Sequence, residues 1–598
     1  MNGSEYIALF LEKKKLQNVY LVTGGAIAFV VDSIGRKKYS SLHCFQHEQS
    51  ASMAADTVWR VSKEKSVGVC MATSGPGAVN LLSGLGCSFV DSIPSICITG
   101  QVNIKESSKY GYANLRQAGY QEIDIVSMSK KVTKFSVQVN SANELKYNLA
   151  KAYHEATTGR KGPVLIDVPM DIQQIEVGEY EDFNFYNDSE MSELLLESDK
   201  LKIGDFFKDS KRPLILFGAG VGLAGVEDKL MDWINKNNIP FVASWSAFSY
   251  FDHTNDNYFG HIGVYGNRGA NFILQNSDAL LVLGSRLDNR QRTSNPAMFA
   301  PEAKKLVIDI DNEEIRKYHN DNYITINSNL TKSIDTIVNM KKPKLNNQWL
   351  DYVKDIKEQY FGKDISTAYK KNNSLSPYKV VSKLQEKMTD DSVVLSDCGA
   401  HLCWLYQSFI RQKETIFTAA GFGPIGYSIP AAIGAATSNP DAHIISFSGD
   451  GSFQVQTSEL QVMKSLNLNI CNIIMNDKGY GIVKQFQDSY MNSRYFAAGI
   501  KDGYSVPDFE KVSNAYGLKY LKIESMEQLE SFEFDIEGPS VVEIVLEENI
   551  LIEPKLEMKR PLCDQFPYMS DDEFYRNNKF VKFERVKSVD SSKAENHE

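Results

Sequence analysis

The chain has 598 residues, a formal net charge of -10 at pH 7, and 42% hydrophobic residues. This length predicts three or four domains with sizeable cores. The negative charge argues against a general nucleic-acid-binding protein. No uninterrupted apolar stretch is long enough to cross a membrane, and residues 1–17 predict a short amphipathic helix rather than a signal peptide.

The eight cysteines are scattered along the chain and form no CxxC pair. Most of them lie within apolar stretches, which favours buried free thiols over disulfides or a zinc site. We therefore expect a cytoplasmic protein in a reducing compartment.

Residues 1–175 alternate predicted strands and helices. Strands are expected at 19–22, 41–45, 66–72, 95–99 and 164–168. Polar or glycine-rich turns follow three of them, at 23–26, 47–49 and 73–77. Such turns at strand ends, with helices between, predict an α/β fold with a doubly wound parallel sheet and ligands at its carboxyl edge.

An acidic, weakly apolar stretch at 176–205 predicts an exposed linker that ends in a helix. Residues 206–345 predict a second α/β domain, with strands at 214–217, 241–243, 279–283 and 306–310. Its Gly218-x-Gly220-x-Gly222 turn is not the dinucleotide GxGxxG pattern, so a structural glycine turn is an equal alternative.

The remaining chain predicts a second linker, a third domain and a tail. Residues 346–376 form the linker, with a helix around 349–360, and residues 377–550 form the third α/β domain. Residues 551–598 are charged and rich in proline, which predicts a tail over the surface with a disordered end from about Lys587.

The third domain contains a βαβ unit around Gly449-Asp450-Gly451. An apolar strand is expected at 443–447, a helix with Leu460, Met463 and Leu466 on one face, and a second strand at 470–475. The right-handed crossover brings Asp450 and Asp477 to one sheet edge. Two carboxylates beside a glycine turn suit a divalent cation and a diphosphate, although two ordinary turns are the alternative.

The GDG turn, followed 27 residues after Asp450 by the turn at 476–480, resembles the signature of thiamine diphosphate (ThDP) enzymes. Over residues 3–550 the chain is similar to the acetolactate synthase-like branch of ThDP-dependent decarboxylases and carboligases. The resemblance implies three doubly wound domains in order: pyrimidine-binding, central FAD-type and diphosphate-binding.

At the reactive end, residues 47–56 resemble the family segment whose glutamate, here Glu48, hydrogen-bonds N1′ of the aminopyrimidine. A helix-dipole partner is the alternative. Residues 418–431 match the segment in which a large aliphatic side chain, here Ile425, supports the bent cofactor and a carbonyl, here Gly423, accepts from its 4′-amino group. Family members typically carry methionine where Ile425 stands.

At the diphosphate end, the resemblance assigns Asp450, Asp477 and the Gly479 carbonyl to Mg²⁺. Asp477 replaces the usual asparagine, and its added charge could weaken cofactor binding or shift the metal preference. Residues 397–404 resemble the GQHQMW segment, with both glutamines replaced; a packed structural role is an alternative for His401. Further cofactor-binding positions are Gly399, Ala400, His401, Leu402, Gly449, Gly451, Ser452, Tyr480, Gly481 and Ile482.

The reaction type is inferred from Tyr120 and Gln121, which stand where simple pyruvate decarboxylases carry a His-His pair. Without that proton donor, the two-carbon unit is expected to attack a second carbonyl. Gly25 and Lys134 complete the catalytic set. A solvated surface lysine is the alternative for Lys134.

In the central domain, residues 260–266, 284–290 and 307–311 resemble flavin-binding segments and imply a structural FAD. The implied residues are Gly218, Gly263, Arg286, Asp288, Arg290, Asp309 and Asp311. Arg290 also falls where the family holds the acceptor carboxylate; an ion pair with Asp288 or Asp309 is the alternative. Phe486 replaces the family's acceptor-selecting tryptophan.

These features predict a ThDP- and Mg²⁺-dependent enzyme that decarboxylates pyruvate or a similar 2-oxoacid and transfers the two-carbon unit to an acceptor carbonyl. The resemblance implies a homodimer or homotetramer with Glu48 from one chain and Asp450 from the other, and no nucleic-acid or membrane partner. Phe486 and the long tail keep open a carboligase acting on a keto sugar in polysaccharide synthesis. A simple 2-oxoacid decarboxylase and a non-catalytic cofactor-binding homologue also stay open.

Overall fold

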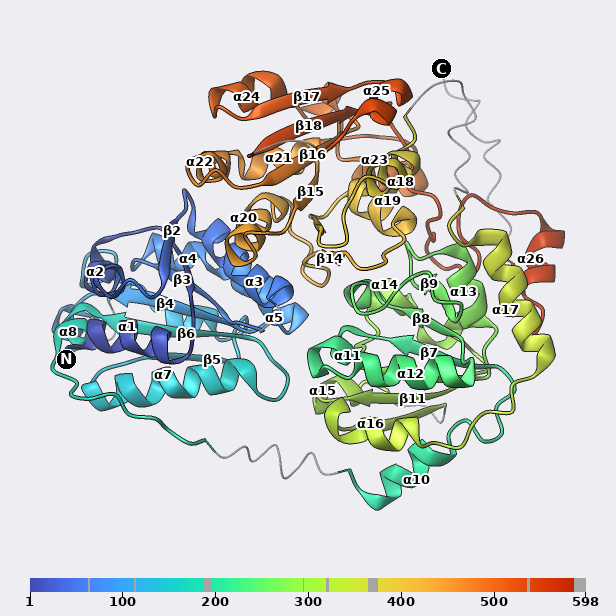
Figure 1. Cartoon of the computed structure of the whole chain (residues 1–598), viewed down its shortest axis with the longest axis horizontal. Helices are drawn as coiled ribbons and strands as arrows, with labels where there is room; N and C mark the ends of the chain where they lie inside the picture. The colour runs from blue at the N-terminus through green and yellow to red at the C-terminus, as the bar shows by residue number, and fades with distance from the viewer. Residues whose placement is uncertain are drawn as a thin grey trace. The chain divides into compact units, whose positions relative to one another are not determined.

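The computed structural model describes residues 1–62, 65–111, 115–185, 195–293, 295–318, 322–363, 375–534 and 538–585 (Figure 1). Parts of the two predicted linkers (186–194 and 364–374) and the predicted disordered end from Lys587 lie outside these residues. Within the described residues, one compact unit comprises those of Met1–Ser192, Asn373–Leu405 and Lys413–Ile550. The second unit comprises those of Glu193–Asn372, Tyr406–Gln412 and Leu551–Glu598.

The first unit begins with a six-stranded parallel sheet in the order β2-β1-β3-β4-β6-β5. Its strands are β1 Asn18–Leu21, β2 Ser41–Cys44, β3 Gly68–Ala72, β4 Ser95–Gln101, β5 Phe135–Gln138 and β6 Pro163–Pro169. Its helices are α1 Gly3–Lys13, α2 Ala28–Lys37, α3 Glu48–Val61, α4 Pro76–Asn80, α5 Leu82–Asp91, α6 Ile125–Ser129, α7 Ala142–Thr157 and α8 Met170–Gln174.

The other sheet of this unit is also parallel, in the order β14-β13-β15-β16-β18-β17. Its strands are β13 Val393–Ser396, β14 Thr415–Phe417, β15 Ile444–Gly449, β16 Ile470–Asn476, β17 Lys519–Ile523 and β18 Ser540–Val545. Its helices are α18 Pro377–Gln385, α19 Ala400–Ser408, α20 Ser428–Ser438, α21 Asp450–Val455, α22 Leu460–Ser465, α23 Gly481–Met491, α24 Phe509–Ala515 and α25 Met526–Ser531. Counted along the chain, the two sheets have the same strand order, so they repeat one plan.

The core of the first unit follows from the alternation of side chains along its strands. In β3, Val69 and Met71 face one core, whereas Cys70 and Ala72 face another that also contains residues of α3, α5 and α20. Helices α3 and α20 meet at small residues, because a Cβ at Gly434 would come within 2.4 Å of the Ala54 carbonyl oxygen. This close crossing joins the two sheets of the unit.

The second unit contains a parallel sheet in the order β12-β11-β10-β7-β8-β9, the doubly wound order with its switch point between β7 and β10. Its strands are β7 Pro213–Phe217, β8 Phe241–Ala243, β9 Tyr258–His261, β10 Ala279–Leu283, β11 Lys304–Asp309 and β12 Tyr323–Asn327. Its helices are α10 Glu197–Asp205, α11 Ala219–Ala224, α12 Glu227–Asn237, α13 Arg268–Gln275, α14 Asn289–Arg292, α15 Asn312–Ile315, α16 Leu330–Val338, α17 Asn347–Tyr360 and α26 Asp571–Asn577.

Two expectations about packing were wrong. Leu466 was expected on the buried face of one helix with Leu460 and Met463, but α22 ends at Ser465 and Leu466 is 43% exposed. The described part of the tail does not lie over the surface. Its Leu562 and Phe574 are buried in one core with Trp349, because the charged and proline residues obscure an apolar pattern that only packing reveals.

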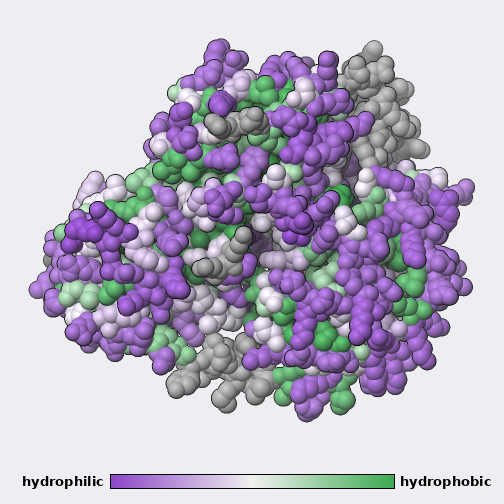
Figure 2. Space-filling model, viewed as in Figure 1, coloured by the Kyte–Doolittle hydropathy of each residue, from purple (hydrophilic) through white to green (hydrophobic). Residues whose placement is uncertain are grey.

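The surface and the thiols agree with the composition. Hydrophilic residues predominate on the face shown in Figure 2. Among the described helices, none combines the length and the apolar character needed to cross a membrane. All eight cysteines are free, and all but Cys44 and Cys398 are buried, as expected for thiols within apolar stretches.

Candidate functional site

Glu48 is the first residue of α3, and its carboxylate lies against the glycine turn that follows β3. Asn80 Nδ2 donates to Glu48 Oε2 over 2.9 Å. A Cβ at Gly77 would lie 3.1 Å from Glu48 Oε1, so the turn packs closely against the carboxylate because it has a glycine at this position. The helix start and the turn therefore hold this side chain in one place.

Two other segments that the sequence analysis assigned to catalysis pack against the same turn. Gly75 has φ +61°, and a Cβ there would come within 2.6 Å of the Gln121 carbonyl oxygen. The Thr73 hydroxyl accepts from the Ala26 backbone N–H over 3.3 Å, next to Gly25, which borders open space. Glu48, Gln121 and Gly25 thus meet around residues 73–77, and the neighbouring Tyr120 is 83% exposed.

Lys134 occupies a different environment from either sequence interpretation. Its ammonium donates to the carbonyls of Glu155 and Thr158, at the carboxyl end of α7. Burial lowers the pKa of Lys134 to about 8. An ammonium at a helix carboxyl end satisfies free carbonyls and the helix dipole. The geometry therefore favours a structural role in capping α7 over catalysis or a solvated position.

The start of α3 is held by a residue that the sequence interpretation missed. Glu459, in the 3-10 turn Thr457–Glu459, accepts the backbone N–H groups of Gln46 (3.2 Å) and His47 (3.0 Å). Burial raises the pKa of Glu459 to about 7, against the opposing effect of these hydrogen bonds. Ser50 Oγ also donates to Gln456 Oε1 over 2.7 Å. In the sequence, Glu459 is indistinguishable from a solvated helix glutamate.

Ile425 projects from a loop between two glycines in the left-handed region. Gly423 has φ +64° and Gly426 has φ +81°. Ile425 itself is 40% exposed, although it lies between buried elements. A Cβ at Gly426 would come within 2.8 Å of Val455, so this turn packs tightly on α21. The loop presents an apolar side chain to open space, as a supporting wedge requires.

A buried ion network fastens that loop to α3 and α5. Arg60 binds Asp56 (2.8 Å) and Asp91 (2.9 Å). Asp91 Oδ1 accepts the Gly421 N–H over 2.9 Å, and Tyr427 Oη donates to Asp56 over 2.6 Å. Charges this deeply buried persist only when paired and hydrogen-bonded. The network therefore specifies how the Ile425 loop sits on the first sheet.

The turns after β15 and β16 meet at the carboxyl edge of the other sheet of the first unit. Asp450 begins α21, and its Oδ2 accepts the Gly479 N–H over 3.0 Å. Burial raises the pKa of Asp450 to about 6. The expected convergence of the two turns is thus present, and it rests on the adjacent parallel pairing of β15 with β16.

Asp477 carries the observation that bears on a metal. Its side chain is buried, and its Oδ2 has no hydrogen-bond partner among the described residues. Burial and the Asp450 carboxylate raise its pKa, while Lys484 opposes them. Two neighbouring buried carboxylates with an unsatisfied oxygen fit a divalent cation. No group of three acidic, histidine or cysteine ligands occurs in the described part of the chain, so a backbone carbonyl such as that of Gly479 would complete the protein ligands.

His401 packs against Asp397 and two glycines, which favours its structural alternative. Its Nε2 lies 2.7 Å from Asp397 Oδ1, which also accepts from Ser452 Oγ over 2.9 Å. Cβ atoms at Gly399 and Gly449 would collide with the histidine ring. The ring thus fills the space between these two glycines, and the Ser452 hydroxyl is engaged with Asp397. Ala400 begins α19, and Leu402 is buried in it.

The remaining residues of this end lie on or beside α23. A Cβ at Gly451 would come within 2.7 Å of the Tyr480 ring, and one at Gly481 within 2.2 Å of Asp477 Oδ2. Ile482 is half-buried on the first turn. Phe486 is 38% exposed, and its ring is tilted by 56° against that of Tyr490, with 4.8 Å between the ring centroids. It is available to contact a ligand.

The predicted flavin residues of the second unit mostly stabilise turns. Asp288 caps α14 by accepting the Arg290 N–H over 2.8 Å. Asp311 caps α15 by accepting the Glu313 N–H over 2.9 Å. The N–H of Asp311 in turn donates to Asp309 over 2.9 Å. The Arg290 guanidinium lies 5.3 Å from the centroid of the Tyr265 ring. Arg286 pairs with Asp288 at 3.4 Å.

The glycine turn after β7 is filled by protein atoms. A Cβ at Gly218 would come within 2.1 Å of the Gly284 carbonyl oxygen, and one at Gly222 within 2.0 Å of the Tyr250 ring. Gly263 has φ +117°, and a Cβ there would come within 2.5 Å of the Arg290 carbonyl oxygen. These glycines permit close backbone packing, which matches the structural alternative for the turn.

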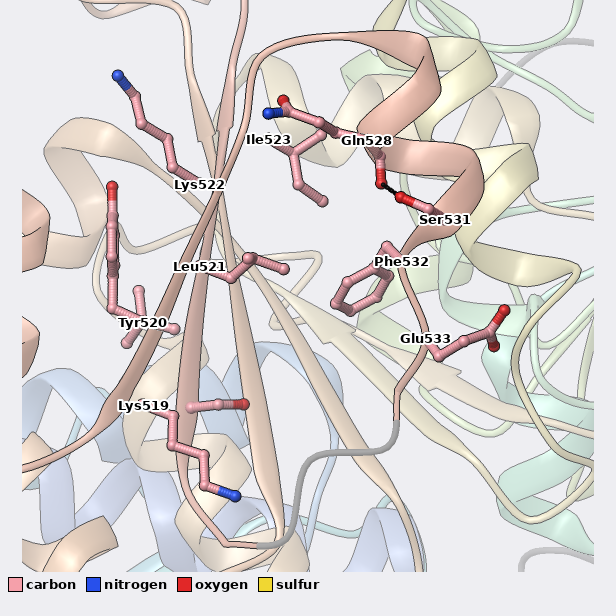
Figure 3. Close-up of a pocket in the computed structure, with 11 residues that line it drawn as sticks. Lys519, Tyr520, Leu521, Lys522, Ile523, Gln528, Ser531, Phe532 and Glu533 are labelled. Atoms are coloured by element: carbon pink, nitrogen blue, oxygen red, sulfur yellow. Dashed lines mark hydrogen bonds between the residues drawn. The ribbon is translucent and has the colours of Figure 1, made fainter.

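A cavity of about 400 Å³ lies elsewhere, between the edge strand β17 and α25 (Figure 3). Leu521 and Phe532 face each other across it, with Lys519 and Glu533 near its ends. None of the predicted site residues lines it. The cavity is therefore separate from the site described above.

Comparisons with known proteins match three family models in order along the chain. The thiamine pyrophosphate enzyme N-terminal TPP binding domain matches residues 1–128, the central domain 202–337 and the C-terminal TPP binding domain 397–544. The chain is 29% identical over 553 residues to an acetolactate synthase isozyme 2 large subunit of Escherichia coli, covering 92% of this chain and 96% of the relative. It is 30% identical over 540 residues to an acetolactate synthase large subunit of Lactococcus lactis, covering 88% and 89%.

Proposed function

Because the chain belongs to the thiamine pyrophosphate enzyme family, in its acetolactate synthase-like branch, we propose that it decarboxylates pyruvate or a similar 2-oxoacid and joins the two-carbon unit to an acceptor carbonyl. The observation that carries the proposal is the meeting of Glu48, Gln121 and Gly25 at one glycine turn. A carboxylate fixed there suits proton exchange with a bound heterocycle.

Thiamine diphosphate, when bound, supplies an electron sink that accepts the bonding electrons as CO₂ leaves. Glu48 would share a proton with the aminopyrimidine N1′, and the Gly423 carbonyl would accept from its amino group. Ile425 would support the bend of the cofactor. Gln121 and Tyr120 would border the reacting carbon without supplying the proton that ends the reaction early.

At the diphosphate end, Asp450, Asp477 and the Gly479 carbonyl would hold Mg²⁺. The unsatisfied oxygen of Asp477 and the raised pKa of Asp450 support this assignment. Residues 449–452 form the turn and the first residues of α21, where backbone N–H groups favour phosphate oxygens. Residues 399–402 and 480–482 would border the same group.

FAD fits the second unit less well. The glycine turn at 218–222 is covered by Gly284 and Tyr250, so a flavin diphosphate could approach it only if Tyr250 moved. The sequence predicted a structural FAD rather than one that acts in turnover, and no step of the proposed reaction needs it. The visible absorbance spectrum of the purified protein tests it: a flavin spectrum would require that rearrangement.

We further propose a homodimer or homotetramer, with Glu48 of one chain and Asp450 of another serving one cofactor, in a reducing cytoplasm that the free cysteines favour. Mixing Glu48→Gln with Asp450→Ala chains tests the shared site. Recovery of activity in the mixture is expected, and two inactive variants that stay inactive together would contradict it.

The product formed from pyruvate, ThDP and Mg²⁺ tests the reaction. Acetolactate is expected from pyruvate alone, and Glu48→Gln should abolish most of it, whereas the exposed Glu179→Gln serves as a control. CO₂ release only after addition of a keto sugar would favour the polysaccharide-type carboligase that Phe486 leaves open. Acetaldehyde as the sole product would contradict carboligation.

A further inference from the structure

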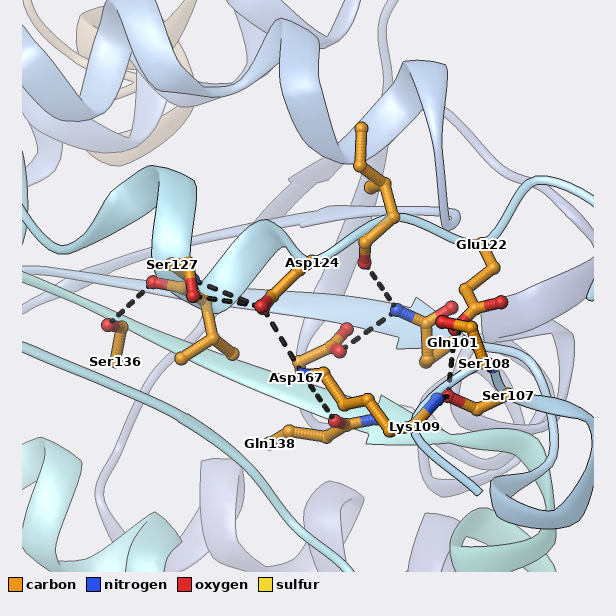
Figure 4. A network of polar contacts seen from close by, with 12 residues as sticks. Gln101, Ser107, Ser108, Lys109, Glu122, Asp124, Ser127, Ser136, Gln138 and Asp167 are labelled. Atoms are coloured by element: carbon orange, nitrogen blue, oxygen red, sulfur yellow. Dashed lines mark hydrogen bonds and ion pairs between the residues drawn. The ribbon is translucent and has the colours of Figure 1, made fainter. Parts of the chain in front are cut away.

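Glu122 follows the Tyr120-Gln121 pair in the chain. Its side chain lies beside Ser107 and Ser108 (Figure 4). Glu122 is 8% exposed. Its Oε1 accepts from Ser107 Oγ (2.8 Å), Ser108 N (2.7 Å) and Ser108 Oγ (2.7 Å). Its Oε2 accepts from Ala118 N (3.0 Å) and Gly119 N (3.1 Å). One side chain therefore joins both ends of the segment that leads into Gln121.

These hydrogen bonds keep the carboxylate ionised. Burial alone would raise the pKa of Glu122, but the donors of Ser108, Ala118, Ser107 and Gly119 outweigh it and lower the pKa to about 2. Hydrogen bonds to an ionised acceptor are about twice as strong as neutral ones. The anchor is therefore in its strongest form throughout the neutral pH range.

A second anchor holds the residue after Glu122. Gln101 Nε2, at the end of β4, donates to the Ile123 carbonyl (3.0 Å) and to Asp167 Oδ2 (3.1 Å). Asp167 lies on the adjacent strand β6 and also accepts from Thr99 Oγ1 over 2.7 Å. Figure 4 shows Gln101 between Asp167 and the Glu122 region. The segment is thus bound to the sheet immediately beyond Gln121.

Gln121 itself has a conformation that needs such support. Its φ is +60°, in the left-handed region that disfavours a residue with a Cβ. In this conformation its carbonyl oxygen lies against Gly75, in the turn that also approaches Glu48. The turn therefore keeps Gln121 at a fixed position relative to Glu48 only while the residues on both sides of Gln121 are held in place.

We propose that Glu122 is a positioning residue that holds Gln121 against the Glu48 turn and so decides whether the two-carbon unit is transferred or protonated. The proposal rests on the proposed function. A loosened segment would let water reach the reacting carbon, and protonation would then compete with attack on the acceptor. A merely structural Glu122 would affect stability without changing this ratio.

The test replaces Glu122 with glutamine, which has one acceptor oxygen where the carboxylate has two. The matched control is Glu106→Gln, an exposed glutamate in the same segment. Two quantities are measured on the full enzyme: hydrogen exchange of the Ser108, Ala118 and Gly119 amides, and the ratio of acetolactate to acetaldehyde formed from pyruvate. For Glu122→Gln we expect exchange to rise about fivefold or more and the ratio to fall about fivefold, with no change in the control.

Every outcome decides the proposal. Unchanged exchange would overturn the anchoring, and faster exchange with an unchanged product ratio would overturn the role in reaction outcome. If Glu122→Gln does not fold, Ser108→Ala removes one of the five donors. The same two quantities are then measured, and smaller changes in both are expected. If the wild-type enzyme makes no carboligation product, the proposed function fails and this inference falls with it, whereas a failure confined to Glu122→Gln leaves the proposed function standing.

Discussion

Glu459 accepts the backbone N–H of His47 over 3.0 Å, one residue before Glu48. His47 precedes α3, which packs on the first sheet of the unit, whereas Glu459 lies between β15 and β16 of the other sheet; His47 and Glu459 are 412 positions apart in the sequence. The contact means that the residue proposed to exchange a proton with the cofactor begins its helix at a place fixed by the other half of the unit.

Replacing Glu459 with glutamine should therefore impair the enzyme without touching Glu48. The amide keeps one acceptor oxygen, so one of the N–H groups of Gln46 and His47 loses its partner, at a cost of about 1–3 kcal/mol. We expect ThDP affinity and activity to fall roughly tenfold, measured by fluorescence titration and product formation. Glu510→Gln, on an exposed position of α24, is the control, and equal affinities in the two variants would contradict the role.

The metal end gives a prediction for Asp477→Asn. Removing one of two neighbouring buried carboxylates relieves an unfavourable charge, so the metal-free variant should be more stable by about 1–3 kcal/mol. Adding Mg²⁺ alone should stabilise the variant less than the wild type, because the variant has lost one carboxylate ligand. Thermal denaturation with a chelator and with Mg²⁺ measures both effects. Asp441→Asn, at an exposed position, should change neither the stability without metal nor the stabilisation by Mg²⁺. If Asp477→Asn were less stable than the wild type without metal, the assignment of Asp477 to the metal site would be contradicted.

Arg60→Met tests the buried ion network. Asp56 and Asp91 would be left buried without a cation, which should cost about 3–5 kcal/mol of the free energy of unfolding, measured in urea. Arg36→Met is a matched control, because Arg36 pairs with Asp32 at the same i,i+4 spacing and the same 2.8 Å. That pair is more than half exposed and should contribute about 0–1 kcal/mol. Similar losses in both variants would refute a special role for Arg60.

Asp167 predicts how stability depends on pH. Burial raises its pKa from 3.8 to about 7, so between these values the folded protein holds a proton that the unfolded chain releases. The contribution of Asp167 to the free energy of unfolding is fully present below about pH 4 and is lost as pH rises through about 7. Asp167→Asn should reduce this slope by up to about 1.4 kcal/mol per pH unit. Melting temperatures at several pH values measure it, with Asp441→Asn as control; parallel curves for Asp167→Asn and wild type would rule it out.

Strands flanked by glycine turns were predictable, whereas several edge strands were not. The apolar stretches that form β3, β7, β10 and β16 are continuous because both faces of these strands are buried. Strands β5, β12 and β17 lie at sheet edges and are half-exposed, so they have no apolar stretch to recognise. Their place depends on pairing with a neighbour rather than on local composition.

By itself, the sequence determined that three parallel-sheet domains follow one another, and that Glu48, Asp450 and Asp477 stand at strand ends. Those conclusions rest on local chemistry, namely alternation, glycine turns and the spacing of one βαβ unit. Only the tertiary structure decided that Glu459 and Glu122 hold the site, that Lys134 caps a helix, and that Tyr250 covers the turn at 218–222. The contacts of Glu459, Lys134 and Tyr250 join residues that are far apart in the sequence, and strand order and helix packing bring them together. The contacts of Glu122 join positions 107–108 and 118–119 to one nearby side chain, through a backbone conformation that the sequence pattern does not specify.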